Sequence, residues 1–222
     1  MKIERRRERE WGWLFALGVF VALAAVSYAA WDDPLVRWVH AHGIDKATKQ
    51  YWWWVRKARV IWPGHFASTV LIALIIGFVH RAHWRGAALI LLAGVFSGAN
   101  SILKWAAGRQ RPNPKLGEPS MAFHPFAGGL KKLFVQENLA FPSGDVALAV
   151  ATAAALSYLM PRAWPIWWAL AVIVAAQRIG ESAHHLSDCF AAAALGIVAF
   201  HCARLACRLL PDRSTDEGQP RS

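Results

Sequence analysis

The chain alternates long apolar stretches with short polar segments. About 20 apolar residues in a helix cross the hydrocarbon core of a bilayer. Six stretches approach this length, the fourth and fifth with help from their neighbours: Trp11 to Ala30, Val60 to Val79, Ala87 to Ala107, Val146 to Met160, Ala163 to Ala176 and Cys189 to Leu209. We therefore predict an all-α polytopic membrane bundle with about six transmembrane helices over residues 11–210. A basic segment, residues 1–10, precedes it, and a disordered polar tail, residues 211–222, follows it.

The composition agrees with a membrane protein. Of the 222 residues, 56% are hydrophobic and 13 are tryptophan, although the formal net charge is +11. Such a charge also fits a nucleic-acid-binding protein, but the lysines and arginines are scattered between apolar stretches, so we expect no nucleic-acid partner. All the cysteines lie in the last apolar stretch, with neither a disulfide framework nor a metal-ligand spacing: Cys189, Cys202 and Cys207.

The N-terminal charges predict the orientation. Residues 1–7 read Met-Lys-Ile-Glu-Arg-Arg-Arg, and positively charged segments stay on the cytoplasmic side of a membrane. We therefore expect a cytoplasmic N-terminus. Ser27 and Ala29 also fit a signal-peptide cleavage site, which would remove the first apolar stretch. The loop from about Trp31 to Arg59 contains Trp52-Trp53-Trp54 next to basic residues, and it either lies at the membrane interface or packs against the other loops.

The first polar cluster has the pattern Lys-x6-Arg-Pro, with Lys104, Arg111 and Pro112. Lys104, Gly108 and Arg111 share one face of a helix that we expect to end near Arg111, because proline disfavours helix in the residue before it. A lysine and an arginine at one helix end suit a phosphate group, and Gly108 would keep that face open. The alternative is a positively charged anchor at the membrane surface.

The second cluster, Pro142-Ser143-Gly144-Asp145, opens the fourth apolar stretch. Proline and serine are typical of a helix start, where exposed backbone N–H groups bind anions. Gly144 would let a ligand approach the backbone closely. An ordinary helix N-cap explains the same pattern.

The third cluster has the pattern Arg-x5-His-x3-Asp, with Arg178, His184 and Asp188. His184 and Asp188 share a helix face if the last helix begins early, and the carboxylate can then fix the imidazole tautomer. An oriented, neutral histidine is a competent nucleophile or base. His185 is a second candidate, three residues from Asp188, and a structural hydrogen bond is the alternative reading of the pair.

Together the three clusters resemble the three-part signature of the type 2 phosphatidic acid phosphatase superfamily, which includes membrane lipid phosphatases and soluble haloperoxidases. All three clusters fall on the same side of the membrane in the six-helix count, as one shared site requires. The resemblance implies that these residues bind the phosphate group: Lys104, Arg111, Ser143, Gly144 and Arg178.

The resemblance also implies that His184 attacks phosphorus to form a phosphohistidine and that Asp188 orients it, with no metal or other cofactor. The chain departs from the family pattern at Asp145, where the family has a histidine that acts as the general acid, and at Gln177, where serine is common. An ionised Asp145 would repel a phosphate by roughly 4 kcal/mol at about 4 Å in an effective dielectric of about 20. Asp145 must therefore stay protonated, pair with a cation or be offset by surplus positive charge.

We therefore expect a lipid phosphatase of a bacterial inner membrane, with its site at the periplasmic or exterior face. The substrate classes are undecaprenyl diphosphate, lipid A, phosphatidylglycerol phosphate and phosphatidic acid. A diphosphate suits Asp145, because a departing phosphate needs little protonation. A lipid phosphotransferase and a non-catalytic lipid-phosphate-binding protein are the alternatives. The loop over residues 113–140 is expected to cover the site, and its His124 could replace the missing acid. The oligomeric state stays open.

Overall fold

The computed structural model describes residues 2–51, 65–79, 84–112, 123–126, 129–130 and 138–209. Its regular elements in these ranges are helices, and the predicted all-α class is confirmed. They are α1 (Lys2–Ala30), α2 (Asp32–Ala41), α3 (Ile44–Tyr51), α5 (Phe66–Val79), α6 (Trp84–Ser97), α7 (Asn100–Ala107), α9 (Gly144–Leu159), the short 3-10 helix η2 (Pro161–Ala163), α10 (Trp164–Gly180) and α11 (Leu186–Arg208). The predicted polar tail, residues 211–222, lies outside the described residues.

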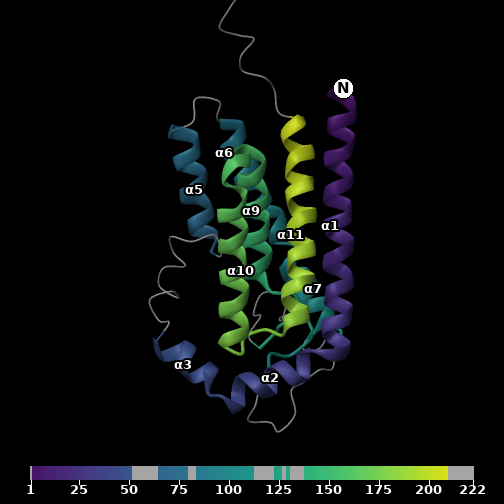
Figure 1. Ribbon diagram of the computed structural model, residues 1–222, viewed down its shortest axis with the longest axis vertical. Helices are drawn as coiled ribbons and strands as arrows, with labels where there is room; N and C mark the ends of the chain where they lie inside the picture. Colours follow the sequence, from purple (N-terminus) through teal and green to yellow (C-terminus); the bar gives the residue numbers. More distant parts are fainter. Residues whose placement is uncertain are drawn as a thin grey trace, which may run out of the picture.

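Helices α1, α5, α6, α9, α10 and α11 run side by side along the long axis of the molecule (Figure 1). Helix α9 contacts α6, α10 and α11, and every residue from Val146 to Leu156 is buried. At Gly196 of α11, an added Cβ atom would lie 2.6 Å from the carbonyl oxygen of Ala147. The two backbones therefore approach each other closely, as small residues allow in membrane bundles.

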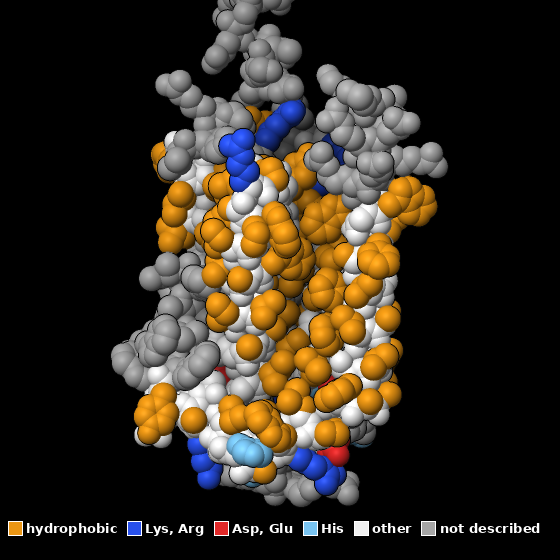
Figure 2. Space-filling view, in the orientation of Figure 1, with side chains coloured by type: hydrophobic (Ala, Val, Ile, Leu, Met, Phe, Trp, Pro, Cys, Tyr) orange, Lys and Arg blue, Asp and Glu red, His pale blue; other side chains and the backbone are white. Residues whose placement is uncertain are grey.

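Four segments are long and apolar enough to cross a membrane: Trp11–Ala30, Trp84–Ala107, Pro161–Gly180 and Leu186–Arg208. Two shorter apolar helices, Phe66–Phe78 and Gly144–Leu159, join them. Hydrophobic side chains cover the visible face along the bundle, and Lys and Arg gather near its two ends (Figure 2). The predicted membrane bundle is confirmed. The fifth predicted stretch is longer than expected, and part of the second lies outside the described residues.

Helices α2 and α3 cross the end of the bundle that lies opposite the N-terminus (Figure 1). The predicted loop is therefore helical over Asp32–Ala41 and Ile44–Tyr51. Its remainder, residues 52–59, lies outside the described residues. Each helix turns a few residues inward: α2 buries Asp32, Val36 and Val39, and α3 buries Asp45 and Thr48. Because α2 contacts α11 and α3 contacts α10, the two helices close the bundle at the end where α10 finishes and α11 begins.

Candidate active site

The three motif clusters meet at the end of the bundle that α2 and α3 cross. The charges of Lys104 and Arg111 from the first cluster, and of Arg178 from the third, act on the His184 imidazole. Asp145 of the second cluster lies 3.2 Å from Arg178. The contributing elements are the last turn of α7 for Lys104, the chain just after it for Arg111, the start of α9 for Ser143, Gly144 and Asp145, the last turn of α10 for Arg178, the α10–α11 connection for His184 and the first turn of α11 for Asp188.

The spacing predicted that the first cluster forms one helix, and this prediction is wrong. Helix α7 ends at Ala107 because Gly108 is its left-handed C-cap, with φ of 63°, a conformation that favours glycine. Gly108 does not open the face to a ligand either, since a Cβ atom there would lie 1.8 Å from the carbonyl oxygen of His124. The glycine instead lets the following loop return across the helix end. The His124 side chain itself is exposed.

An extended segment brings Arg111 to the site in place of a helix. The Arg111 N–H donates to the Asn138 carbonyl at 3.0 Å, and the Ala140 N–H donates to the Arg109 carbonyl at 2.7 Å. These bonds pair the end of the first cluster with the residues just before the second, as the isolated antiparallel bridge between Gln110 and Leu139 records. The pairing also fixes the carbonyl group of Ala140, which faces His184.

His184 is held as a neutral imidazole with a defined tautomer. Its side chain is 2% exposed, and its Nδ1 lies 2.7 Å from the Ala140 carbonyl oxygen. A carbonyl only accepts, so Nδ1 carries the proton and Nε2 carries the lone pair. Burial first, and then the positive charges of Arg178, Lys104 and Arg111, hold the pKa of His184 well below its usual value of 6.5. The lone pair on Nε2 lies 3.4 Å from Nη2 of Arg178.

Asp188 does not make the direct hydrogen bond to His184 that we expected. Its Oδ2 lies 3.9 Å from Nδ1 of His184, but 2.8 Å from the backbone nitrogen of His185 and 3.2 Å from Nδ1 of that residue. The cause is local, because His185 is the N-cap of α11 and Asp188 its third residue, and the two form a capping box. The Ala140 carbonyl is therefore the direct partner of His184.

Arg109 is the buried cation that sequence reasoning missed. It is 0% exposed, and its guanidinium donates to Asp188 at 2.6 Å, to Asp32 at 2.8 Å and to the Ser187 hydroxyl at 2.7 Å. The rings of Tyr28 and Phe123 lie 5.2 and 5.3 Å from it, within cation–π range. Arg109 therefore joins α2 to the start of α11 beneath the site.

Asp32 ties the same network together from α2. One oxygen accepts the Ser187 backbone N–H at 2.9 Å, and the other accepts the Ser187 hydroxyl. Asp32 is 0% exposed. A buried carboxylate requires a paired cation and hydrogen bonds, and Arg109 and Ser187 supply both. Asp32 was not selected from the sequence. The signal that could have identified it is a charged residue directly after the first apolar stretch.

Arg178 forms ion pairs with two carboxylates. Its Nη1 donates to Glu181 at 3.0 Å, and its Nε lies 3.2 Å from Oδ2 of Asp145, whose side chain is 31% exposed. Gln177 in turn donates to Glu181 at 3.2 Å. Both departures from the family pattern, Asp145 and Gln177, therefore bear on Arg178. Glu181, which sequence reasoning did not select, is 7% exposed and belongs to this cluster.

The second cluster begins α9 as predicted, with Ser143 as N-cap and Gly144 as the first residue of the helix. The Ser143 side chain makes no cap hydrogen bond, and its buried hydroxyl has no partner among the described residues. At Gly144, an added Cβ atom would lie 2.6 Å from Nδ2 of Asn100. The missing side chain therefore admits Asn100, a buried residue one helical turn before Lys104 that the sequence reasoning also missed.

His185, the second candidate nucleophile, is 0% exposed and faces Asp188. Its Nε2 has no hydrogen-bond partner among the described residues. The charges of Arg178, Lys104 and Arg111 act on His184. Within the described residues, His, Cys, Asp and Glu form no group of three or more that could hold a metal ion.

Comparisons with known proteins agree with this geometry. A model of the PAP2 superfamily, the type 2 phosphatidic acid phosphatases, matches residues 83–209, a range that contains all three clusters. A search of curated proteins finds no match. A solved structure, the first transmembrane PAP2-type phosphatidylglycerolphosphate phosphatase from Bacillus subtilis, is similar with a TM-score of 0.55 and 21% identity, over 90% of this chain and 98% of that one.

At this identity the likeness to the solved structure shows the fold alone. The family model covers more than half of the chain, and family membership makes the protein a membrane phosphatase. The chain thus belongs to the PAP2 superfamily.

Proposed function

We propose that the protein hydrolyses a phosphate or diphosphate group of an amphiphilic lipid through a phosphohistidine at His184. One observation carries the proposal. Nδ1 of His184 donates to the Ala140 carbonyl, which leaves the lone pair on Nε2, and the charges of three cations act on that ring. A neutral nucleophile beside fixed positive charge suits attack on an anionic phosphoryl group.

In the first step, the lone pair of His184 Nε2 forms a bond to phosphorus while the bond from phosphorus to the leaving-group oxygen breaks. In the second step, a water oxygen attacks phosphorus, the P–N bond breaks and its electron pair returns to Nε2. The water releases a proton to solvent, and inorganic phosphate leaves. Nδ1 keeps its proton throughout, because the Ala140 carbonyl holds it.

The other predicted site residues stabilise the charge on the phosphoryl oxygens in this mechanism. Fixed donors aimed at developing charge are usually the largest contribution to catalysis. Cations serve here as the charge-neutralising groups: Lys104, Arg111 and Arg178. The Ser143 hydroxyl is buried and has no partner among the described residues. It and the backbone N–H of Gly144 at the helix start donate further hydrogen bonds.

Asp145 favours a diphosphate substrate in this proposal. Asp145 lies 3.2 Å from Arg178, where it serves as the carboxylate partner of a guanidinium. An ionised carboxylate has no proton to give to the leaving group. A lipid alcohol leaves poorly without that proton, whereas a phosphate leaves readily from a diphosphate. The enzyme therefore acts on a lipid whose departing group is a weak base.

Matched lipid monophosphates and diphosphates test this preference in the wild type and in Asp145→His. We expect the wild type to prefer the diphosphate and the histidine to raise the monophosphate rate about 100-fold or more, the usual effect of a positioned general acid. A wild type that prefers the monophosphate and gains nothing from the histidine would refute the preference.

A second candidate function is binding of lipid phosphates without hydrolysis. The observation that favours it is the occupation of Arg178 by both Asp145 and Glu181. Phosphate release from a panel of lipid phosphates, with His184→Ala as the blank, separates the candidates. Release that is lost in His184→Ala while lipid binding persists supports the enzyme. Binding with no release from the wild type supports the binder, and a phosphorylated acceptor lipid supports a phosphotransferase.

The orientation follows from the same proposal. The N-terminus and the site lie at opposite ends of the bundle (Figure 1), and the basic first residues favour the cytoplasm. We therefore place the site at the outer face of a bacterial inner membrane, with all six apolar helices crossing it. Lys46 and Lys49, exposed on α3, should react with a membrane-impermeant amine reagent in intact cells. Reaction only after permeabilisation would reverse the orientation.

A further inference from the structure

A cavity lies at the end of the bundle opposite His184. It has a volume of about 300 Å³ and is lined by residues from the ends of α5, α6, α9 and α11. Ile76, Leu89 and Leu159 supply an apolar wall. Asp188 and Arg208 lie near opposite ends of α11, and 20 residues of helix at about 1.5 Å each separate them by about 30 Å. The cavity is therefore separate from the candidate active site.

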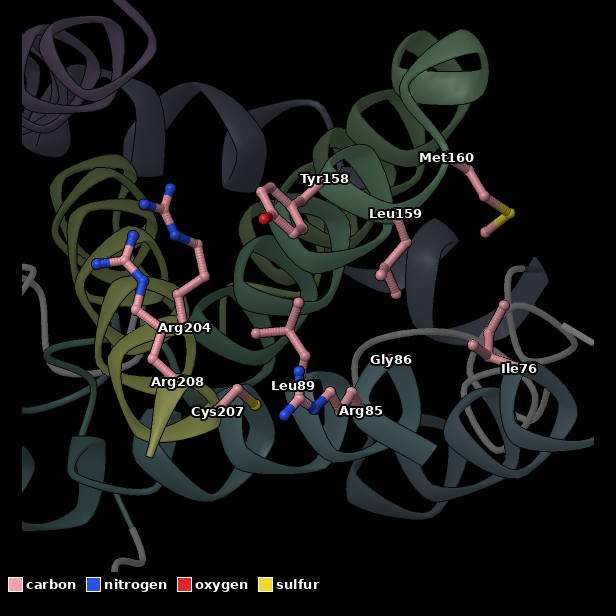
Figure 3. A pocket seen from close by; sticks show the side chains of 10 residues that line it. All are labelled: Ile76, Arg85, Gly86, Leu89, Tyr158, Leu159, Met160, Arg204, Cys207 and Arg208. Carbon is pink, nitrogen blue, oxygen red and sulfur yellow. The ribbon is translucent and has the colours of Figure 1, made fainter. Parts of the chain in front are cut away.

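Three arginines line this cavity. Arg204 and Arg208 extend from α11, and Arg85 extends from the facing helix α6 (Figure 3). Among the described residues that line it, none is acidic. Arg204 and Arg208 are four residues apart, so their side chains lie on one face of α11.

The aromatic residues hold one of these arginines in place. The guanidinium of Arg204 lies 5.5 Å from the ring of Tyr158 and 5.9 Å from the ring of Phe200. Such contacts restrict a flexible side chain before any ligand binds. A planar guanidinium group can bind phosphate oxygens through two parallel hydrogen bonds.

We propose that this cavity binds the headgroup of an anionic phospholipid from the leaflet at the N-terminal end of the bundle. The lipid phosphate contacts Arg85, Arg204 and Arg208, and the first carbons of its acyl chains pack against the apolar wall. Basic pockets between transmembrane helices are typical sites for anionic lipid headgroups. The combination of positive and apolar lining, at the end of a hydrophobic bundle, favours a lipid over a soluble anion.

The arrangement differs from simple anchoring of helix ends. Arginines that only anchor a helix reach outward to the headgroup layer and act independently of one another. Here cations from two helices line one hollow together with Tyr158. A defined binding site binds one lipid with an affinity that depends on the residues that line the cavity. Anchoring depends only on the total surface charge.

Lipid binding to the purified full-length protein tests the proposal. Native mass spectrometry measures retention of phosphatidylglycerol, with phosphatidylethanolamine as the zwitterionic comparison. The variant is Arg85→Gln/Arg204→Gln/Arg208→Gln. The matched control is Arg37→Gln/Lys46→Gln/Arg162→Gln, which removes the same charge from exposed residues outside the cavity. All proposed catalytic residues remain in both proteins.

We expect the wild type and the control to bind one phosphatidylglycerol in preference to phosphatidylethanolamine. The cavity variant should lose about 100-fold in affinity, since each basic residue beside an anionic headgroup contributes roughly fivefold. Equal losses in the cavity variant and the control would overturn the proposal in favour of non-specific surface charge. Unchanged binding in the cavity variant would also overturn it.

Two further arms complete the test. Arg208→Gln alone, an exposed residue at the helix end, should lower the affinity roughly fivefold and answers the question if the triple variant fails to fold. Glycerol 3-phosphate should neither bind the cavity nor displace the lipid. If it binds as tightly as the lipid and only in proteins with the three arginines, the ligand is a soluble phosphate and the lipid proposal is wrong.

Discussion

Nη1 of Arg109 lies 2.6 Å from Oδ1 of Asp188, and both side chains are fully buried. The carboxylate of the third motif is therefore neutralised by an arginine from inside the first motif. Asp188 stands 3.9 Å from His184, so the network of Arg109, Asp188 and Asp32 lies close to the imidazole. Burial and the nearby cations hold the pKa of His184 low, and a change in the charge of this network should shift that pKa in turn.

We predict that Arg109→Gln moves the acid limb of kcat/KM to higher pH. The variant leaves the negative charges of Asp188 and Asp32 uncompensated, and these favour protonated His184, which raises its pKa and removes the nucleophile at higher pH. The variant is also less stable, because breaking a buried ion pair costs about 3–5 kcal/mol. The pH dependence of kcat/KM on one lipid substrate measures the shift.

Asp32→Asn should act in the opposite direction. It removes a negative charge, leaves Arg109 less compensated and lowers the pKa of His184, so the acid limb moves to lower pH or stays in place. If Arg109 and Asp32 were purely structural, both variants would lower kcat/KM, and the acid limbs of the two pH profiles would not move apart. Movement of both limbs in the same direction would refute the electrostatic role of this network.

Gly108→Ala should abolish activity and destabilise the protein by more than about 2 kcal/mol. The alanine meets left-handed strain of about 1–2 kcal/mol and a Cβ atom placed 1.8 Å from the His124 carbonyl oxygen. Gly43→Ala is the matched control, because Gly43 has the same φ of +63° but nothing within 4 Å of an added Cβ atom. Thermal unfolding and phosphate release compare the two, and equal effects would show that strain alone matters at Gly108.

Asp145→Asn should strengthen inhibition by inorganic phosphate about tenfold. The asparagine removes a negative charge that lies 3.2 Å from Arg178, but solvent screens an interaction of a side chain that is 31% exposed. The inhibition constant for phosphate, measured near neutral pH, reports the change. Asp33→Asn, which breaks an exposed pair with Arg37, is the control. Weaker inhibition in Asp145→Asn would mean that Asp145 assists binding.

The sequence predicted the membrane bundle and the meeting of the three motifs, because apolar length and motif spacing are visible in one dimension. It did not predict the Arg109–Asp32 pair, whose members are 77 residues apart and share no local pattern. The approach of α2 to α11 creates that contact, and the sequence around Asp32 shows only a charged residue after an apolar stretch.

The partner of His184 escaped prediction for a different reason. Ala140 acts through its backbone carbonyl, and a side-chain pattern says nothing about where a carbonyl points. The i,i+4 spacing of His184 and Asp188 suggested a direct bond, but the capping box at the start of α11 turns the carboxylate toward His185. The spacing thus correctly placed His184 near Asp188, while local hydrogen bonding determined which group each side chain contacts.

The central claim is that Nε2 of His184 forms a covalent bond to phosphorus during turnover. Rapid mixing of the enzyme with a lipid diphosphate, quenching in alkali to preserve an acid-labile phosphoramidate, and peptide mass spectrometry measure this directly. We predict a phosphoryl group on His184 in the wild type, and none in His184→Ala. Turnover of the wild type with no phosphoryl group on His184 at any time before the steady state, or with the group on His185, would contradict the account.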